Sequence, residues 1–148
     1  MERVARIPGM EKSESGRMIG IDTNIILRVF IDDDEAQVAA VAKLLAGRGP
    51  ASIRLTNVVI AEFVWTLMRR YKREKADIID VLEQLLQREE LVFENRNALM
   101  TALRWYESGP ADFADYLVGA LNEEAGASTT FTFDQDAADH TAFSLVTP

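Results

Sequence analysis

The 148-residue sequence contains no cysteine and only one histidine, His140. The lack of cysteine excludes disulfides, thiol catalysis and thiolate metal sites, and it is typical of a cytoplasmic protein. No apolar run approaches the ~18 residues that a membrane span needs. Residues 1–17 also lack the apolar centre of a secretory signal. With a mean hydropathy of −0.05, the sequence predicts a soluble globular protein of the cytoplasm.

Lysine and arginine are missing from residues 105–148, a segment that contains eight acids. The net charge of −8 therefore lies in this last part of the chain. A polyanion would be repelled there unless cations intervened. Two interpretations remain open, a solvated acidic surface that favours solubility and a set of ligands for a metal cation.

The length suits one domain with a hydrophobic core. No repeat, low-complexity tract or linker divides the chain, and the first apolar pattern begins at Met18. We therefore predict a flexible N-terminal extension over residues 1–17 and a single domain over residues 18–148.

Short apolar segments alternate with amphipathic ones along this domain. The alternation predicts an α/β fold, with three α/β/α layers and a mostly parallel central sheet of about four to five strands. We expect strands at residues 19–21, 52–55, 91–93, 129–133 and 143–146, and helices at 25–30, from Asp33 or Asp34 to Gly47 or Gly49, from Thr56 or Asn57 to Tyr71, and at 76–86, 95–106 and 111–125.

Two of the expected strands end on an acid, Asp22 after MIGI and Asp134 after TTFTF. In parallel α/β sheets the ligand site lies beyond the carboxyl ends of the strands. Glu62, Asp112 and Asp115 fall near the starts of helices, where the positive end of the helix dipole tolerates carboxylates. Taken singly, Asp22 and Asp112 also suit helix caps, and Glu62 suits a solvated helix position.

Acids that converged would repel one another unless a cation neutralised them. Oxygen ligands without cysteine favour Mg²⁺ or Mn²⁺ over Zn²⁺. Carboxylates that hold such cations can orient and activate water for the hydrolysis of phosphodiesters.

Four stretches in this order resemble the PIN-domain nucleases, in particular the VapC-type toxins of toxin–antitoxin pairs. They are IDTN at 21–24, TNVVIAEFVW at 56–65, ADFADYLVGA at 111–120 and TFTFD at 130–134. The resemblance implies a metal-dependent endoribonuclease that uses Mg²⁺ or Mn²⁺. It also implies a homodimer that is inhibited by a small antitoxin protein.

Residue by residue, the resemblance implies that four acids are catalytic and bind the metal, namely Asp22, Glu62, Asp115 and Asp134. Asn24 and Thr23 are implied to brace the site by hydrogen bonds, and Asp112 to lie beside it. Asp115 is favoured over Asp112 as the third acid because it precedes the pattern Val118-Gly119-Ala120.

The candidates for RNA contact are Arg28 and a basic run that includes Arg69, Arg70 and Arg73. The basic run also lies at a helix C-terminus, where cations are favourable without any ligand. We expect the two tryptophans, Trp65 and Trp105, to anchor the core or an interface, with base stacking as the alternative.

Three other functions fit parts of this pattern. A receiver-type phosphoacceptor domain resembles this pattern, but it requires a late lysine, and the chain has none after Lys75. An aspartyl phosphatase would need a second acid where Asn24 stands. A non-catalytic or regulatory binding module on the same fold is the remaining alternative to a nuclease.

Overall fold

The structure is a computed structural model that describes residues 17–148. The predicted extension therefore lies outside the described residues, apart from Arg17. Among the described residues, no helix is both long and apolar enough to cross a membrane. The strands are β1 (Ile19–Gly20), β2 (Ile53–Leu55), β3 (Leu91–Phe93), β4 (Thr130–Thr132) and β5 (Phe143–Leu145).

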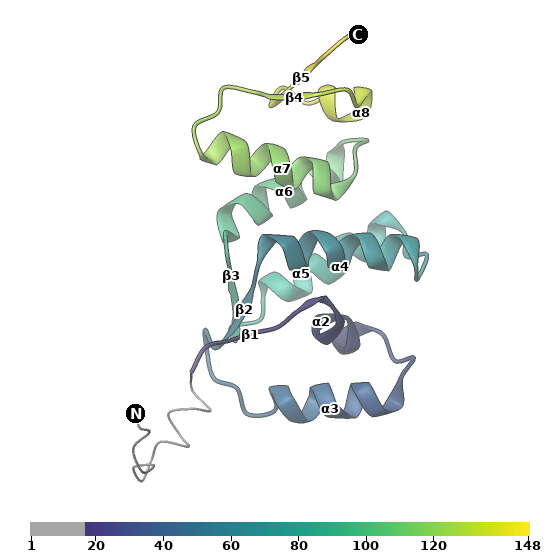
Figure 1. Cartoon of the computed structure of the whole chain (residues 1–148), viewed down its shortest axis with the longest axis vertical. Helices are drawn as coiled ribbons and strands as arrows, with labels where there is room; N and C mark the ends of the chain where they lie inside the picture. Colours follow the sequence, from purple (N-terminus) through teal and green to yellow (C-terminus); the bar gives the residue numbers. More distant parts are fainter. Residues whose placement is uncertain (1–16) are drawn as a thin grey trace.

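Helices connect these strands and make up most of the domain (Figure 1). Their boundaries follow the predicted ones closely, except that α8 was not predicted. They are α2 (Thr23–Phe30), α3 (Glu35–Leu45), α4 (Asn57–Arg69), α5 (Lys75–Leu86), α6 (Arg96–Ser108), α7 (Phe113–Glu124) and α8 (Gln135–Ala138).

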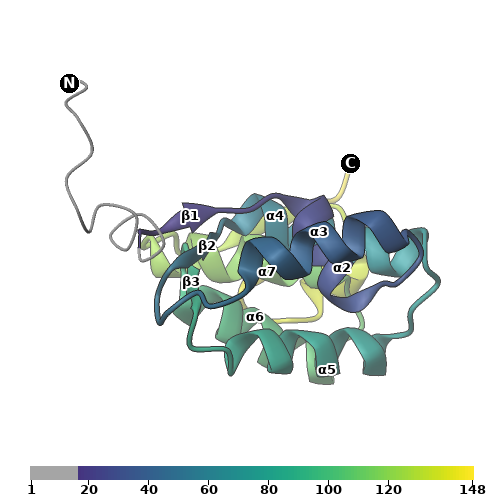
Figure 2. The ribbon, with the colours of Figure 1, turned by 90° about the horizontal axis from the view of Figure 1, so that it is seen from below.

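A parallel sheet of β1, β2 and β3 is flanked by these helices, which confirms the α/β class. β2 lies in the middle, with Ile19 paired to Ile53 and Leu55 paired to Phe93. Figure 2 shows the three strands side by side at one end of the molecule, with the helices extending away from them. β4 and β5 form a separate parallel pair.

The expected single sheet of four to five strands is therefore divided into two. Figure 1 shows β4 and β5 beyond α7, away from β1. β1 has only two residues and offers little edge for a further strand. A short turn that includes Gly126, at a φ of 97°, leads from α7 directly into β4. β4 packs on α7, and the Asn122 side chain donates a hydrogen bond of 3.0 Å to Thr130 Oγ1.

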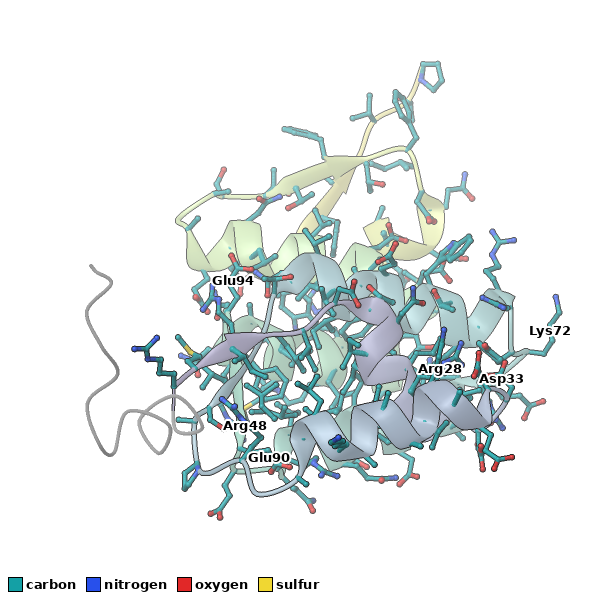
Figure 3. All side chains as sticks on the ribbon, turned by 60° about the horizontal axis from the view of Figure 1, so that its bottom comes forward. Arg28, Asp33, Arg48, Lys72, Glu90 and Glu94 are labelled. Atoms are coloured by element: carbon teal, nitrogen blue, oxygen red, sulfur yellow. The ribbon has the colours of Figure 1, made fainter. Side chains whose placement is uncertain are left out.

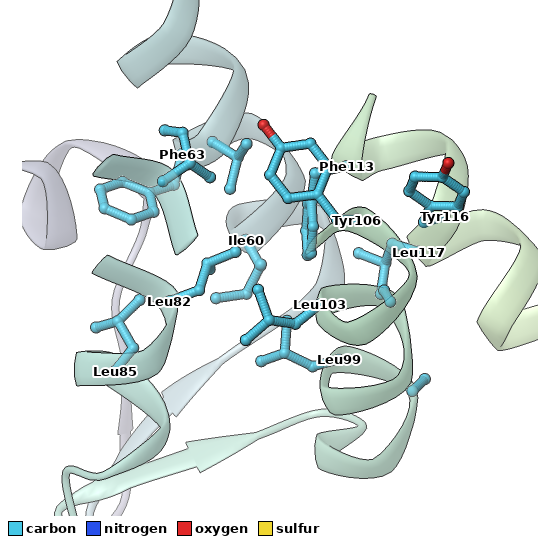
Figure 4. Packing of buried hydrophobic residues seen from close by; sticks show 14 of the residues in the cluster. Ile60, Phe63, Leu82, Leu85, Leu99, Leu103, Tyr106, Phe113, Tyr116 and Leu117 are labelled. Carbon is cyan, nitrogen blue, oxygen red and sulfur yellow. The ribbon is translucent and has the colours of Figure 1, made fainter. Parts of the chain in front are cut away.

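The hydrophobic core lies between the amphipathic helices α4, α5, α6 and α7 (Figure 4). Phe63, Leu82 and Phe113 are completely buried in it. Within each helix the buried apolar residues recur at helical spacing, because each helix turns one apolar face toward the others. This packing fixes the directions of α4 and α7, the two helices that carry the candidate site acids Glu62 and Asp115.

The helix starts mostly agree with the predicted caps. The Thr56 hydroxyl accepts a hydrogen bond from the Val59 amide, and the Asn95 side chain accepts one from the Ala98 amide. The predicted start of a helix at Pro110–Ala111 is wrong, since α7 begins at Phe113. The Ala111 amide instead donates to the Tyr116 hydroxyl at 3.1 Å, which holds the segment before the helix outside the helical path.

Candidate functional site

Asp22 lies two residues after the end of β1 and is the N-cap of α2. One of its carboxylate oxygens accepts a hydrogen bond of 3.4 Å from the Ile25 amide. The side chain is nevertheless exposed, so the cap does not use up its other oxygen. Asp22 thus has both of the roles expected for an acid at this point, a helix cap and a carboxylate at the end of a strand.

Glu62 reaches the same place from α4. The Thr23 hydroxyl donates a short hydrogen bond to Glu62 Oε1 and thereby joins the starts of α2 and α4. Thr23 is buried, whereas Asn24 is exposed and lines the same hollow. This hollow has a volume of about 170 Å³ and is lined by Asp22, Thr23, Asn24, Glu62, Thr66 and Arg70.

Asp115 lies in the first turn of α7 and forms the second acidic location together with Asp134. Burial raises the pKa of Asp115, and the charges of Asp134 and Asp112 raise it further. A hydrogen bond between the Asp115 and Asp134 carboxyl groups also favours the protonated form of Asp115. The two carboxyl groups are therefore close enough to share a proton, and each lies at the place predicted for an acidic ligand.

Asp112 occupies the N-cap position of α7, but its carboxylate makes no capping hydrogen bond. Its backbone carbonyl instead accepts from the amides of Asp115 and Tyr116. The expected capping role thus falls to the backbone, and the carboxylate is left exposed beside Asp115.

Asp134 follows β4 and caps α8, the short helix that the sequence did not reveal. Its carboxylate accepts hydrogen bonds from the amides of Asp136 and Ala137, at 2.9 and 3.4 Å. An acid followed by a short run without glycine or proline could have indicated a capped turn, but four residues are too few to show helical periodicity.

The described residues thus bring the predicted acids together in two groups. Asp22 and Glu62 share one hollow, and Asp115 and Asp134 lie beside each other. Within residues 17–148, no group of three or more His, Asp or Glu side chains is spaced to hold one metal ion. One shared site of four acids is therefore not formed in this arrangement, and the metal-binding roles of these acids stay predictions.

The chemistry of the donors nevertheless suits a hard cation. Both groups offer carboxylate oxygens, which Mg²⁺ and Mn²⁺ prefer. Asp115 is half-buried beside Asp134, and such a pair needs either a proton or a cation between its charges. Asp115 and Asp134 consequently fit a divalent cation best.

The candidate RNA-contacting arginines differ in exposure and in the contacts they make within the protein. The Arg28 guanidinium forms an ion pair with Asp33 and donates a hydrogen bond of 2.7 Å to Gln37 Oε1 (Figure 3). Its side chain is only 9% exposed. Asp33 also accepts a hydrogen bond from the Tyr71 hydroxyl at 2.8 Å, so this network ties α2 to the end of α4. Arg28 therefore holds the fold together and presents little charge to a ligand.

Arg69, Arg70 and Arg73 are exposed at the end of α4. The Arg69 guanidinium lies over the Trp65 ring, 5.9 Å from its centroid. Arg70 lines the hollow that contains Asp22 and Glu62. Arg73 instead lines a hollow with Asp77 and Asp80 of α5, which offset its charge.

The two tryptophans have different environments. Trp105 packs against His140, with ring centroids 4.1 Å apart, and against Tyr116. The packing of Trp105 agrees with its expected place at the core. His140, the only histidine of the sequence, is thus a packing residue. Trp65 is 59% exposed, so a core role for Trp65 is wrong. This exposure agrees with the helical spacing, because Trp65 lies outside the apolar stripe that contains Ile60, Val64 and Leu67.

The acids, the strands that carry them and the helices between them form one continuous stretch of chain. A comparison with family models matches the PIN domain over residues 19–143. The chain belongs to the PIN domain family. Among curated proteins, a search for relatives finds no match.

PIN domains are typically metal-dependent nucleases. The matched range contains all four predicted acids, the sheet of β1, β2 and β3, and β4. Membership supports a nuclease reading over a receiver-type phosphoacceptor, because the family match covers the acids in their predicted order.

Proposed function

We propose that this PIN domain is an endoribonuclease that depends on Mg²⁺ or Mn²⁺. The observation that carries the proposal is the pair Asp115 and Asp134, held together by α7 and the end of β4. Burial and the charges of Asp134 and Asp112 raise the pKa of Asp115, and a cation beside the pair would relieve this repulsion. Structural acids without a ligand would gain stability by moving apart into solvent.

In this proposal Asp115 and Asp134 hold the cation, while Asp22 and Glu62 complete the acidic surroundings of the scissile phosphate. A bound divalent cation would neutralise phosphate charge and lower the pKa of a water molecule. Thr23 orients Glu62 by its hydrogen bond, and the N-cap contact of Asp22 fixes that carboxylate at the end of β1. Arg70 faces this hollow and can contact an RNA phosphate.

The test is cleavage of single-stranded and structured RNA by the purified chain with Mg²⁺, with Mn²⁺ and with EDTA. We expect cleavage with either metal and none with EDTA. Asp115→Asn should abolish cleavage. The control is Asp139→Asn, which changes an exposed acid at the end of α8 and should leave cleavage intact. RNA that stays intact at high protein concentration with both metals would contradict the proposal and favour a non-catalytic binding module.

We also propose the biological setting implied by the sequence motifs, a toxin that acts as a homodimer and is held inactive by an antitoxin protein. Expression of the chain alone should stop growth, and expression of Asp115→Asn should not. A short DNA-binding protein encoded beside the gene should co-purify with the chain and restore growth. Unimpaired growth despite strong expression would contradict the toxin role without affecting the nuclease proposal.

A further inference from the structure

Trp65 stands out among the exposed apolar side chains because it borders a hollow. This hollow has a volume of about 330 Å³, within the range of small-ligand pockets. Buried Val64 and Phe113 belong to its lining, together with half-buried Met68. Trp65 and Arg69 of α4 and Asp112 of α7 complete it.

The hollow adjoins both acidic locations. Asp112, which lines it, lies close enough to Asp115 to raise the pKa of that carboxyl group. Glu62 lies one helical turn before Trp65 on α4, and it faces the hollow that contains Asp22. Trp65 therefore lies on the helix surface between the two groups of acids.

We infer that Trp65 and Arg69 form a stacking platform for one base of a single-stranded RNA substrate, next to the acidic site. The inference rests on the proposed nuclease function and names how that site would hold its substrate. An exposed indole offers a π face to any base, and a neighbouring guanidinium adds stacking and positive charge. The position of Arg69 over the Trp65 ring keeps the cation at the platform.

Charge separates this platform from the other exposed aromatic surface. Phe131 on β4 and Phe133 just after it are 70% and 71% exposed, respectively. They lie in the segment from residue 105 onward, which has no lysine or arginine. Beyond the proposed cation on Asp115 and Asp134, that segment offers a phosphate backbone no positive side chain. Arg69 and Arg70, by contrast, lie on the helix that carries Trp65, so the α4 surface is the one that complements RNA.

The competing occupant is a second copy of the chain. Val58 is also exposed on α4, and tryptophan is common at the centre of protein interfaces. Because arginine is also enriched at protein interfaces, the two arginines beside Trp65 do not separate these occupants. RNA is favoured because the platform adjoins the proposed catalytic acids, where a substrate strand must pass. The experiment includes the oligomeric state so that this occupant is detected.

The test compares Trp65→Leu, which keeps apolar bulk without the indole, with Trp65→Phe, which keeps an aromatic face. Binding of a short, labelled single-stranded oligoribonucleotide is measured by anisotropy, and tryptophan fluorescence is followed in the same titration. We expect about tenfold weaker binding for Trp65→Leu and a smaller loss for Trp65→Phe. RNA should quench wild-type fluorescence but not that of Trp65→Leu, where only half-buried Trp105 remains. The matched control Phe131→Ser should bind like wild type.

Equal RNA affinity of Trp65→Leu and wild type, or no quenching of wild-type fluorescence, would overturn the inference. So would a Trp65→Leu protein that changes from dimer to monomer in light scattering, because Trp65 would then belong to a protein interface. RNA that binds with quenching but is never cleaved with Mg²⁺ or Mn²⁺ would contradict the proposed nuclease function and leave the platform standing. Cleavage that is unaffected by Trp65→Leu would contradict the platform and leave the proposed nuclease function standing.

Discussion

The Thr23 hydroxyl donates its hydrogen bond to Glu62 across 39 positions of the sequence. Thr23 belongs to the first turn of α2, directly after Asp22, and Glu62 belongs to the second turn of α4. One buried hydroxyl thus fixes an acid of α4 relative to the end of β1. Glu62 is itself exposed, so its position depends on this contact more than on packing.

Thr23→Val should therefore impair activity more than stability. Valine has a similar shape but no donor, so Glu62 would lose its orientation. We expect cleavage to fall about 10- to 100-fold, as for other outer-sphere partners of metal ligands, with a loss of about 1 kcal/mol in unfolding free energy. Thr23→Ser, which keeps the hydroxyl, should retain most of the cleavage rate. Equal rates for Thr23→Val and Thr23→Ser would show that the hydrogen bond does not matter.

Asp115→Asn should stabilise the metal-free protein at neutral pH. The folded state raises the pKa of Asp115, so it binds a proton more tightly than the unfolded chain does. Stability then falls as the pH rises from the ordinary Asp value of about 3.9 through the raised folded pKa. Asparagine cannot ionise and escapes this loss. In EDTA, the Tm of Asp115→Asn should exceed that of wild type increasingly as the pH rises through this window.

Exposed Glu83 on α5 provides the control for this pH series, since Glu83→Gln should leave the Tm difference flat. A metal-free Asp115→Asn protein that melts below wild type at neutral pH would mean that the carboxylate stabilises the fold. The same variant should lose cleavage by at least about 100-fold, beyond the effect of outer-sphere partners.

Glu62 and Asp134 belong to the two separate groups of acids, so a double-mutant cycle can test whether the groups act together. Glu62→Gln and Asp134→Asn should each abolish most cleavage, and the double variant should be little worse than either one. Such non-additive losses are expected of residues that work as one unit. Additive losses in the single-turnover cleavage rate would indicate two independent sites.

Arg70 and Arg28 should differ in their effect on RNA binding. Arg70 is exposed in the hollow with Asp22 and Glu62, so Arg70→Gln should lower the salt dependence of RNA binding by about one phosphate contact. Arg28→Gln should leave the salt dependence unchanged and lower the Tm, because it breaks the contacts with Asp33 and Gln37. Titrations at several salt concentrations, with melting curves, separate the two. A salt slope altered only by Arg28→Gln would reverse the assignment.

Gly119 and Gly20 form a matched pair for packing. A Cβ on Gly119 would clash with the Phe143 ring, which joins α7 to β5, whereas a Cβ on Gly20 would meet no atom within 4 Å. Gly119→Ala should therefore destabilise the protein by about 1–3 kcal/mol in chemical denaturation. Gly20→Ala should be neutral or slightly stabilising. If Gly119→Ala were as stable as wild type, the second sheet would be less firmly packed on α7 than described.

Local patterns in the sequence predicted most elements. The strand at 91–93 and the caps at Thr56 and Asn95 depend on neighbouring residues alone, and they agree with the structure. The division into two sheets could not be predicted in this way. It depends on how β4 packs against α7 after the turn at Gly126, which is a tertiary contact.

The candidate site follows the same distinction. Asp22 and Asp134 were expected at the ends of strands, and both lie there. The proximity of Asp115 to Asp134 depends on the angle at which α7 packs against the second sheet. No spacing in the sequence encodes that angle, so sequence reasoning placed the acids on their elements but could not group them.

The exposure of Phe131 on β4 and of Phe133 just after it follows from the position of Asp134. Side chains of an extended chain alternate between two sides, so Thr130, Thr132 and Asp134 have one parity and Phe131 and Phe133 the other. Thr130 bonds to Asn122 of α7, and Asp134 lies beside Asp115 of the same helix. A slip of one residue would bury the two rings but carry Asp134 to the opposite side. The strand register that turns Asp134 toward α7 therefore also exposes the rings of Phe131 and Phe133 to solvent.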